Sequence, residues 1–372
     1  MNAIEHTKFY SRKMGCLSKG CTLCVQGKKL VLFVTGVCAK NCYYCPLSTE
    51  KKNVDKVWAN EWLIEKDEDL ITEAKSMDAR GAGITGGDPF LRLDRTCNYI
   101  RMLKKEFGSH FHIHLYAPLC NVSVESFKML FEAGLDEIRF HPDFDNTKDW
   151  KLIEEALKFR WDVGVEIPVV PDKSPQIKKL IDFLDGKIKF LNLNELEISE
   201  TNAAKLGERN FAVKDEVSYA IGGSEELALK LMDYCQNKSF DVHYCTSQLK
   251  DKVQLANRVK RTSKQIARPF DVITQSGMLV RGAVFLEDLK PDVGYRKKIA
   301  ASDKKAVMAR LFELKEKIKK EFKIREDQIE IDPLKLRLIT SPRIVKLFKG
   351  YCRAIIEEYP THDQMEVELR FL

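Results

Sequence analysis

The chain has 372 residues, of which 44% are hydrophobic and 31% are charged, and its formal net charge at pH 7 is +7. These values are typical of a soluble globular protein with one large domain and a smaller one. No apolar run approaches the roughly 20 residues that a membrane-spanning helix needs, and residues 1–13 lack the apolar segment of a signal peptide. We therefore expect a cytoplasmic protein without a membrane partner.

The N-terminal segment, residues 1–28, holds Cys16, Cys21 and Cys24 in a C-x4-C-x2-C pattern. The chain has eleven cysteines, and an odd number of clustered cysteines favours metal ligands over disulfides. The tight spacing, with a glycine inside it, is typical of turns around a metal. The segment therefore predicts an auxiliary iron–sulfur cluster or a structural zinc, with a fourth ligand from elsewhere. The alternative is a set of reduced, partly buried thiols that bind no metal.

Residues 29–245 alternate short apolar runs with amphipathic stretches, which is typical of a parallel sheet with helical crossovers. The expected strands are residues 30–35, 82–85, 111–116, 136–140, 163–169, 188–193 and 240–244. The expected helices are residues 66–78, 94–106, 123–133, 149–159, 173–184 and 224–237. Six strand–helix units and one further strand predict an α/β fold with an open barrel. Chemistry in such barrels gathers at the C-terminal ends of the strands.

Three further cysteines, Cys38, Cys42 and Cys45, follow the first expected strand with C-x3-C-x2-C spacing. Three closely spaced thiolates can hold three irons of a [4Fe–4S] cluster, and no fourth cysteine follows nearby to close it. The alternatives are a zinc site or three unrelated thiols, but zinc sites prefer paired C-x2-C motifs. We therefore predict a cluster whose fourth iron is open.

A glycine turn follows the second expected strand and consists of Gly86, Gly87, Asp88 and Pro89. Glycines let the backbone approach a ligand where a Cβ atom would collide. The turn, the three cysteines and the aromatic Tyr44 together resemble the motifs of the radical S-adenosylmethionine (SAM) superfamily, with aspartate in place of the usual glutamate. The resemblance covers residues 29–245 and implies a partial (β/α)6 barrel.

Membership of that superfamily would imply two cofactors, a [4Fe–4S] cluster and SAM, and a reductant such as flavodoxin or ferredoxin. In the family the open iron binds the amino and carboxylate groups of SAM, and reduction yields methionine and a 5′-deoxyadenosyl radical. Backbone carbonyls of the glycine turn and Asp88 would receive the SAM ammonium. The chain also resembles a narrower group of uncharacterised radical SAM proteins related to pyruvate formate-lyase activating enzymes, in residues 15–29 and 243–251.

The third expected strand alternates, and His112, His114 and Tyr116 share one face. If the apolar face packs on helices, these three side chains line the barrel lumen. His114 and Tyr116, nearer the strand end, are the better site candidates. For His112, a core histidine with satisfied hydrogen bonds is an equal alternative.

The fourth and fifth expected strands carry Arg139, His141 and Glu166. By resemblance to the activating enzymes, Arg139 is assigned to the SAM carboxylate, since a guanidinium–carboxylate hydrogen bond is strong. His141 would donate a proton, contact the ribose or have a structural role. A buried carboxylate needs a partner, so Glu166 pairs with a base such as Arg139 or touches substrate or SAM. His141, Glu166 and Tyr116 are the catalytic candidates.

The last two expected strands end with Asn192, Asn194 and Glu195 and with Cys245. The first three could hydrogen-bond the adenosine or the substrate, and Asn192 is our cofactor-binding candidate; an Asx turn is an equal alternative. Cys245 is the first choice for the fourth ligand of the N-terminal cysteine group. Cys120, after the third strand, is the second choice.

Residues 246–268 carry seven basic side chains and one acid, nearly the whole charge excess, and predict a basic helical connector. The charge favours phosphate or nucleic acid, although a solvated helix face or a clamp onto the barrel is more common. Residues 269–372 predict a separate α+β domain. Its strands are expected at residues 271–274, 278–285, 328–331, 336–340 and 365–371, and its helices at 302–322 and from Ser341 to Glu358. We expect this domain to serve substrate recognition, barrel covering or dimerisation.

The sequence as a whole predicts an enzyme that cleaves SAM and acts on an unidentified substrate, by activating a protein glycyl radical or modifying a peptide or metabolite. An RNA-modifying radical SAM enzyme that uses the basic connector is the first alternative. A non-catalytic metal-binding protein that interacts with RNA is a remote one, because it leaves the glycine turn after the second strand unexplained.

Overall fold

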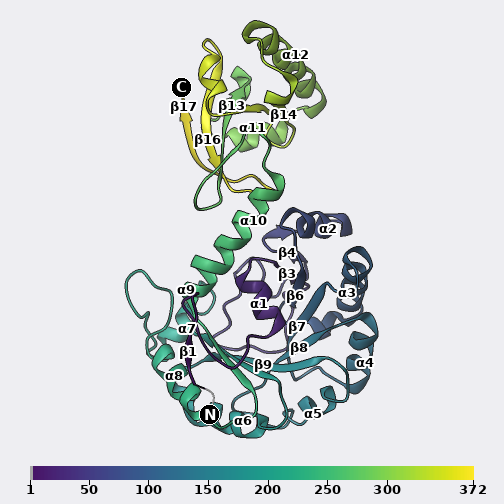
Figure 1. Ribbon diagram of the computed structural model, residues 1–372, viewed down its shortest axis with the longest axis vertical. Coiled ribbons are helices and arrows are strands. Elements are labelled where there is room, and N and C mark those ends of the chain that lie inside the picture. The colour runs from purple at the N-terminus through teal and green to yellow at the C-terminus, as the bar shows by residue number, and fades with distance from the viewer. Residues whose placement is uncertain (1–2) are drawn as a thin grey trace. The chain divides into compact units, whose positions relative to one another are not determined.

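The computed structural model describes residues 3–372 and forms two compact units, Met1–Leu255 and Ala256–Leu372 (Figure 1). We call them the N-terminal unit and the C-terminal unit. Within the described residues, no helix is both long enough and apolar enough to cross a membrane. The boundary between the units falls inside the expected basic connector, residues 246–268. The basic side chains of the connector are therefore divided between the two units.

The N-terminal unit is built on an eleven-stranded sheet whose seven central strands are parallel. In spatial order these are β3 (Lys29–Phe33), β6 (Gly81–Thr85), β7 (His112–Pro118), β8 (Glu137–His141), β9 (Asp162–Val169), β10 (Phe190–Glu195) and β11 (Asp241–Cys245). Spatial order equals chain order, as right-handed strand–helix–strand units require. The sheet ends at β1 and β5 without closing. The expected α/β class and open barrel are confirmed.

Helices cover the outer face of this sheet, and Figure 1 shows them along the convex side. They are α2 (Asp67–Ser76), α3 (Leu93–Phe107), α4 (Val124–Ala133), α5 (Leu152–Ala156), α6 (Ser174–Leu184) and α8 (Ser224–Tyr234); α7 (Ala203–Gly207) is a further short helix. Apolar strand residues such as Ile113 and Leu115 belong to the core cluster that includes these helices. Burial of this face stabilises the unit and leaves the opposite, polar side chains for the lumen.

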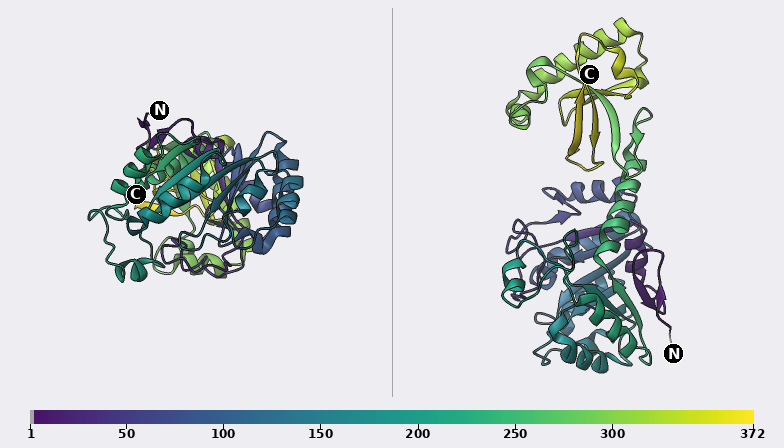
Figure 2. Two further views of the ribbon diagram at one scale, coloured as in Figure 1. Left: turned by 90° about the horizontal axis from the view of Figure 1, so that it is seen from below. Right: turned by 90° about the vertical axis from the view of Figure 1, so that its left-hand side faces the viewer.

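Two antiparallel hairpins flank the parallel strands and were not expected. β1 (Glu5–His6) and β2 (Arg12–Met14) extend the β11 edge, and both views of Figure 2 show the purple N-terminal segment at the edge of the unit. β4 (Trp58–Ala59) and β5 (Trp62–Leu63) extend the β3 edge. Strands of two or three residues are too short to produce a recognisable alternation.

The N-terminal cysteine segment forms a helix, α1 (Lys19–Val25), where the sequence predicted turns. Ser18 caps it, since its hydroxyl accepts a hydrogen bond from the Cys21 amide at 3.2 Å. Figure 1 shows α1 inside the curve of the sheet, whereas α2, α3, α4, α5, α6 and α8 lie outside it. The cysteine segment therefore fills part of the barrel lumen.

The C-terminal unit is an antiparallel sheet with helices, and it confirms the expected α+β class. Its strands are β12 (Val272–Ile273), β13 (Leu279–Phe285), β14 (Ile329–Asp332), β15 (Arg337–Thr340), β16 (Cys352–Glu358) and β17 (Glu366–Phe371). Its helices are α10 (Ala256–Ile266), α11 (Tyr295–Ala301) and α12 (Lys304–Phe322). Apolar residues of α12 such as Leu311 pack with Leu338 of β15 in one core cluster.

One prediction in this unit is wrong, because residues 341–358 are not a helix. A 3-10 turn, Ile344–Leu347, is followed by Gly350 with φ of +88°, which ends the helical geometry. The chain then enters β16, which pairs with both β13 and β17. The apolar run in β16 is compatible with a helix or a strand, and pairing with a strand on each side favours the strand.

The C-terminal unit contains a buried network of ion pairs. Arg281 donates to Glu358 at 2.7 Å, and Arg337 donates to the other oxygen of Glu358 at 2.5 Å. Arg281 also pairs with Asp271, and Arg337 with Asp332. Each of these five side chains is at most 1% exposed, so each charge depends on its partners.

Candidate active site

A cavity of about 650 Å³ opens at the C-terminal ends of the parallel strands. Its wall includes the loop after β3, the glycine turn after β6, and the ends of β7, β8, β9 and β10. In barrels of parallel strands, this edge is where loops from several strands converge on a ligand. The cavity is therefore the candidate site.

Cys38, Cys42 and Cys45 line this cavity together and are half-buried, unpaired thiols. Lys40, inside their loop, pairs with Asp143 after β8 at 2.8 Å, and the Cys45 amide donates to the Cys42 carbonyl at 3.2 Å within the loop. Three thiols on one loop that face an open cavity fit a [4Fe–4S] cluster with one open iron. Cys120 lines the same cavity.

The glycine turn packs tightly against the start of the cysteine loop. The Gly87 amide donates to the Thr35 carbonyl at 2.7 Å, and the Asp88 amide donates to the Val37 carbonyl at 2.8 Å. A Cβ atom on Gly87 would lie 2.4 Å from the Val37 oxygen, and one on Gly86 2.4 Å from the Thr35 oxygen. Only glycine allows this approach, which brings the turn's backbone to the cavity wall.

Asp88 lies beside this wall but does not line the cavity. Its carboxylate accepts hydrogen bonds from Asn121 Nδ2 at 2.5 Å and from the Phe90 amide at 3.0 Å, and it caps the 3-10 turn that Pro89 begins. Burial raises the pKa of Asp88 against the effect of the Asn121 hydrogen bond. The predicted contact of Asp88 with the SAM ammonium stays a prediction, as does a role for the buried Pro89; Gly86 and Gly87 are the turn residues that face the cavity.

Tyr44 and His141 form a fixed pair on the cavity wall. Tyr44 Oη lies 2.9 Å from His141 Nε2, and His141 Nδ1 lies 3.2 Å from the Glu166 carbonyl oxygen. Burial lowers the pKa of His141, which favours the neutral ring. A carbonyl only accepts, so Nδ1 donates to it, and Nε2 then accepts from the Tyr44 hydroxyl. Both ring nitrogens are occupied, which favours a positioning role over proton donation.

Glu166 lies at the floor of the cavity and is fixed by three donors. Arg139 Nη1 donates at 2.8 Å, Asn192 Nδ2 at 2.8 Å and Asn194 Nδ2 at 3.0 Å. Burial raises the pKa of Glu166, but the charge of Arg139 and the amide hydrogen bonds outweigh burial and lower it to about 2. Glu166 is therefore an ionised carboxylate that can accept hydrogen bonds but cannot serve as a general acid near neutral pH.

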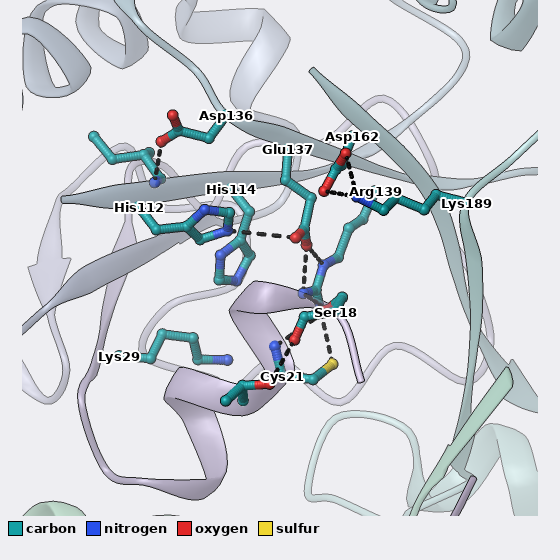
Figure 3. A network of polar contacts seen from close by, with 12 residues as sticks. Ser18, Cys21, Lys29, His112, His114, Asp136, Glu137, Arg139, Asp162 and Lys189 are labelled. Carbon is teal, nitrogen blue, oxygen red and sulfur yellow. Dashed lines mark hydrogen bonds and ion pairs between the residues drawn. The ribbon is translucent and has the colours of Figure 1, made fainter. Parts of the chain in front are cut away.

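Arg139 lies below the floor and does not line the cavity. It donates to Glu137 at 2.5 Å and, through Nη2, to Ser18 at 2.8 Å (Figure 3). It also reaches Tyr116 Oη at 3.2 Å. These partners and Glu166 occupy the guanidinium. Its assignment to the SAM carboxylate stays a prediction, but the geometry favours a structural role in which Arg139 joins β8, β9 and α1.

His114 and Asn192 also contact α1 rather than the cavity. Asn192 Nδ2 donates to Cys21 Sγ at 3.2 Å, and a Cβ atom on Gly20 would lie 2.6 Å from the His114 ring. The expected shared face of His114 and Tyr116 is present, since their side chains are in contact at 3.2 Å. Tyr116 is the member of this pair that reaches the cavity.

The second cysteine group is only partly assembled. Cys21 is buried in the lumen, Cys16 is exposed and Cys24 is half-buried, while Cys245 packs against Val25 of α1. Burial raises the pKa of the Cys21 thiol, but the Arg139 charge and a His243 hydrogen bond lower it to about 6. Across residues 3–372, no cysteine belongs to a group of three ligand atoms within 4.8 Å of one another, the spacing of a single-ion site. The second metal site stays a prediction.

Two lysines of the cavity were missed in the sequence. Lys29, at the start of β3, reaches the floor and lies 3.4 Å from Tyr116 Oη. Lys250, in the basic segment, pairs with Glu197 at 2.6 Å on the wall. No motif marks Lys29, and Lys250 was interpreted only as part of a charge run. One charge of that run therefore serves the cavity.

Comparisons with known proteins agree with this geometry. A profile of the radical SAM superfamily matches residues 32–184. A protein of Methanocaldococcus jannaschii, whose provisional name is glycyl-radical enzyme activating enzyme, is 42% identical over 378 aligned residues, which cover 99% of this chain and 96% of that protein. Its match spans both units.

Two solved structures resemble the chain more distantly. Methylornithine synthase (PylB) is 13% identical with a TM-score of 0.39, over 55% of this chain and 62% of its own. The hydrogenase maturase HydG is 14% identical with a TM-score of 0.39, over 65% of this chain and 64% of its own. The chain thus spans less than two thirds of the length of either structure.

An open α/β barrel with three cysteines and a glycine turn around one cavity defines an enzyme built to hold a metal cluster and a small cofactor. With the superfamily match and the 42% identical relative, the chain belongs to the radical SAM superfamily. Within it, the chain is an enzyme related to the pyruvate formate-lyase activating enzymes.

Proposed function

We propose that this enzyme binds a [4Fe–4S] cluster through Cys38, Cys42 and Cys45, cleaves SAM reductively and takes a hydrogen atom from a glycine residue of a partner protein. The observation that carries the proposal is the meeting of these cysteines with the Gly86–Gly87 backbone at one cavity of about 650 Å³. The name of the 42% identical relative, an activating enzyme for glycyl-radical enzymes, supports the protein substrate.

The cluster, when bound, supplies the electron that divides SAM into methionine and a 5′-deoxyadenosyl radical. Removing a hydrogen atom from a glycine Cα then gives 5′-deoxyadenosine and a glycyl radical. The electron comes from an external one-electron reductant of the flavodoxin or ferredoxin class. The protein's contribution is to bind and orient the reactants and to exclude water.

Different residues of the cavity bind the reactants, orient them and exclude water. The Gly86–Gly87 backbone provides space and polar groups for the SAM amino group, while Tyr44 is held by His141 and cannot turn freely. Glu166 offers a fixed anionic oxygen at the floor, next to the cation Lys29. Apolar side chains of the wall, such as Leu119 and Leu196, limit water around the reacting atoms.

The substitution Cys42→Ala tests the cluster assignment. It should abolish 5′-deoxyadenosine formation by anaerobically reconstituted protein with SAM and dithionite, because two cysteines do not retain a site-differentiated cluster. Cys352→Ala, in β16 of the C-terminal unit, is the matched control and should retain turnover. Undiminished turnover of Cys42→Ala would show that the cluster is held elsewhere.

The glycyl substrate needs a separate measurement. A glycyl-radical enzyme from the same organism, incubated with the reconstituted protein, SAM and reductant, should develop a protein-centred radical signal in electron paramagnetic resonance, with one 5′-deoxyadenosine formed per radical. If 5′-deoxyadenosine forms but no candidate protein acquires the signal, the SAM chemistry stands and the glycyl substrate is wrong.

A further inference from the structure

Three buried side chains meet at the N-terminal end of the sheet, away from the cavity. They are His112 and His114 of β7 and Glu137 of β8 (Figure 3). In the described part of the chain, they form the only group of three His, Cys, Asp or Glu residues whose ligand atoms lie within 4.8 Å of one another. The ladder explains the meeting, because His114 is the register partner of Glu137 and His112 precedes it by two residues on the same face.

One member of this group, His114, has a buried ring nitrogen, Nδ1, without a hydrogen-bond partner in residues 3–372. His112 Nε2 and Glu137 Oε2 lie 3.3 Å apart as an ion pair, and neither atom has a further partner among the described residues. Buried polar atoms are nearly always hydrogen-bonded, so an unpartnered nitrogen beside this pair requires an explanation. Two ligands of a tetrahedral ion with bonds of about 2.0–2.1 Å are separated by about 3.3 Å, so the spacing is that of neighbouring ligands.

The remaining polar atoms of two members are held by outer partners. Arg139 Nε donates to Glu137 Oε1 at 2.5 Å, and His114 Nε2 lies 3.2 Å from Tyr116 Oη. Residues that bind metal ions are commonly oriented in this way through their second polar atom. Gly83 of β6 leaves the space for the His114 ring, since a Cβ atom there would lie 2.7 Å from Nε2. Rotation of the ring or the carboxylate away from the site is thereby restricted.

We propose that His112, His114 and Glu137 form a buried site for a divalent transition-metal ion, Zn²⁺ or Fe²⁺, separate from the cysteine-lined cavity. Two imidazoles and one carboxylate are a ligand set that both ions accept, with a further position for water. Mg²⁺ and Ca²⁺ depend on oxygen ligands, and the site offers one carboxylate.

The site would also fix the cysteine helix. Gly20 of α1 packs on His114 and Arg139, and Ser18 accepts from Arg139 at 2.8 Å. An ion that holds His114 and Glu137 would fix the surface on which α1 rests. The ion would thus contribute to the stability of the N-terminal unit, as metal binding is coupled to folding.

Cobalt substitution tests the proposal with metal ion alone as the probe. The probe is added to full-length protein whose cluster has been reconstituted, so that Cys38, Cys42 and Cys45 are occupied. This protein is titrated with Co²⁺ under argon. One equivalent per chain should bind with d–d absorption and no sulfur-to-cobalt charge transfer, and Zn²⁺ should displace it. Glu137→Gln and His114→Gln, which retain approximate side-chain size, should lose this equivalent. Cys24→Ser, the control for the cysteine group, should retain it.

Three results would overturn the proposal: no Co²⁺ bound by the wild type, charge-transfer absorption that disappears in Cys24→Ser, or undiminished binding by Glu137→Gln and His114→Gln. The first would leave His112 and Glu137 as a bare ion pair. X-ray absorption of Zn²⁺-loaded wild type provides a check that needs no variant. It should show nitrogen and oxygen neighbours with imidazole scattering, and a sulfur shell would refute the site even if the variants fail to fold.

Discussion

Gly20→Ala is the sharpest test of how the cysteine helix sits in the lumen. Gly20 lies inside α1, where alanine would by itself favour the helix by about 0.5–1 kcal/mol. A Cβ atom at this position would lie 2.6 Å from the His114 ring and in collision with the Arg139 guanidinium. The helix can accept alanine only if these two side chains move or α1 shifts outward.

The magnitude follows from how firmly the two neighbours are held. Arg139 is tied to Glu137, Glu166 and Ser18, so its head group cannot move aside without breaking buried hydrogen bonds. Overpacking at such sites costs about 1–3 kcal/mol. After subtraction of the gain in helix propensity, we expect a net cost of about 1–2 kcal/mol, which corresponds to roughly a 5–30-fold change in a local opening equilibrium.

Hydrogen exchange of the peptide that covers residues 16–28, in the full-length protein, measures this opening directly. Gly20→Ala should exchange roughly 5–30-fold faster than wild type. Gly207→Ala is the matched control, because Gly207 ends α7 and an added Cβ atom there has nothing within 4 Å. If Gly20→Ala exchanges as slowly as wild type, α1 does not rest on Arg139 and His114 in the way described.

Two further predictions concern buried charge. Glu358→Ala would leave Arg281 and Arg337 without their shared carboxylate, so we expect the free energy of unfolding of the C-terminal unit to fall by about 3–5 kcal/mol. Calorimetry of the full chain measures this change, and an unchanged unfolding transition would contradict it. The pKa of Glu166 falls from 4.5 to about 2 on folding, so its contribution to stability is complete above pH 4.5 and declines as pH falls toward 2. The stability difference between wild type and Glu166→Gln should therefore shrink from about pH 6 to about pH 3.5 in thermal unfolding, and a constant difference would refute the assigned ionisation.

Much of the N-terminal unit could be predicted because its elements are encoded locally. Seven apolar runs with helical stretches between them define a parallel sheet, and all seven strands are present within a few residues. The cysteine loop and the glycine turn could be predicted to meet because parallel strands share one C-terminal edge. The helix expected at residues 341–358 failed for the opposite reason, since β16 is a strand only through its two neighbours.

The position of each inward-facing side chain along the lumen, near the cavity or below its floor, could not be predicted in the same way. Alternation correctly places Arg139, His114 and Asn192 on the inner face, but it does not say which end of the lumen they serve. Their position depends on α1, which lies in the lumen and contacts these side chains below the cavity floor. Lys29 and Lys250 reach the cavity from segments without any motif, so no local signal marks them.

The sequence by itself determined which segments of the N-terminal unit form strands and helices, where the two cysteine groups lie, and where the glycine turn falls. Strand periodicity, cysteine spacing and a position that tolerates no Cβ atom are all local properties of the chain. Only the tertiary structure decided what the polar inner face does. It divides that face into a cavity at one end and a packed polar network at the other, because a helix and its hydrogen bonds fill the lumen between them. The pairing of His112, His114 and Glu137 likewise depends on register between two strands, which no stretch of sequence contains alone.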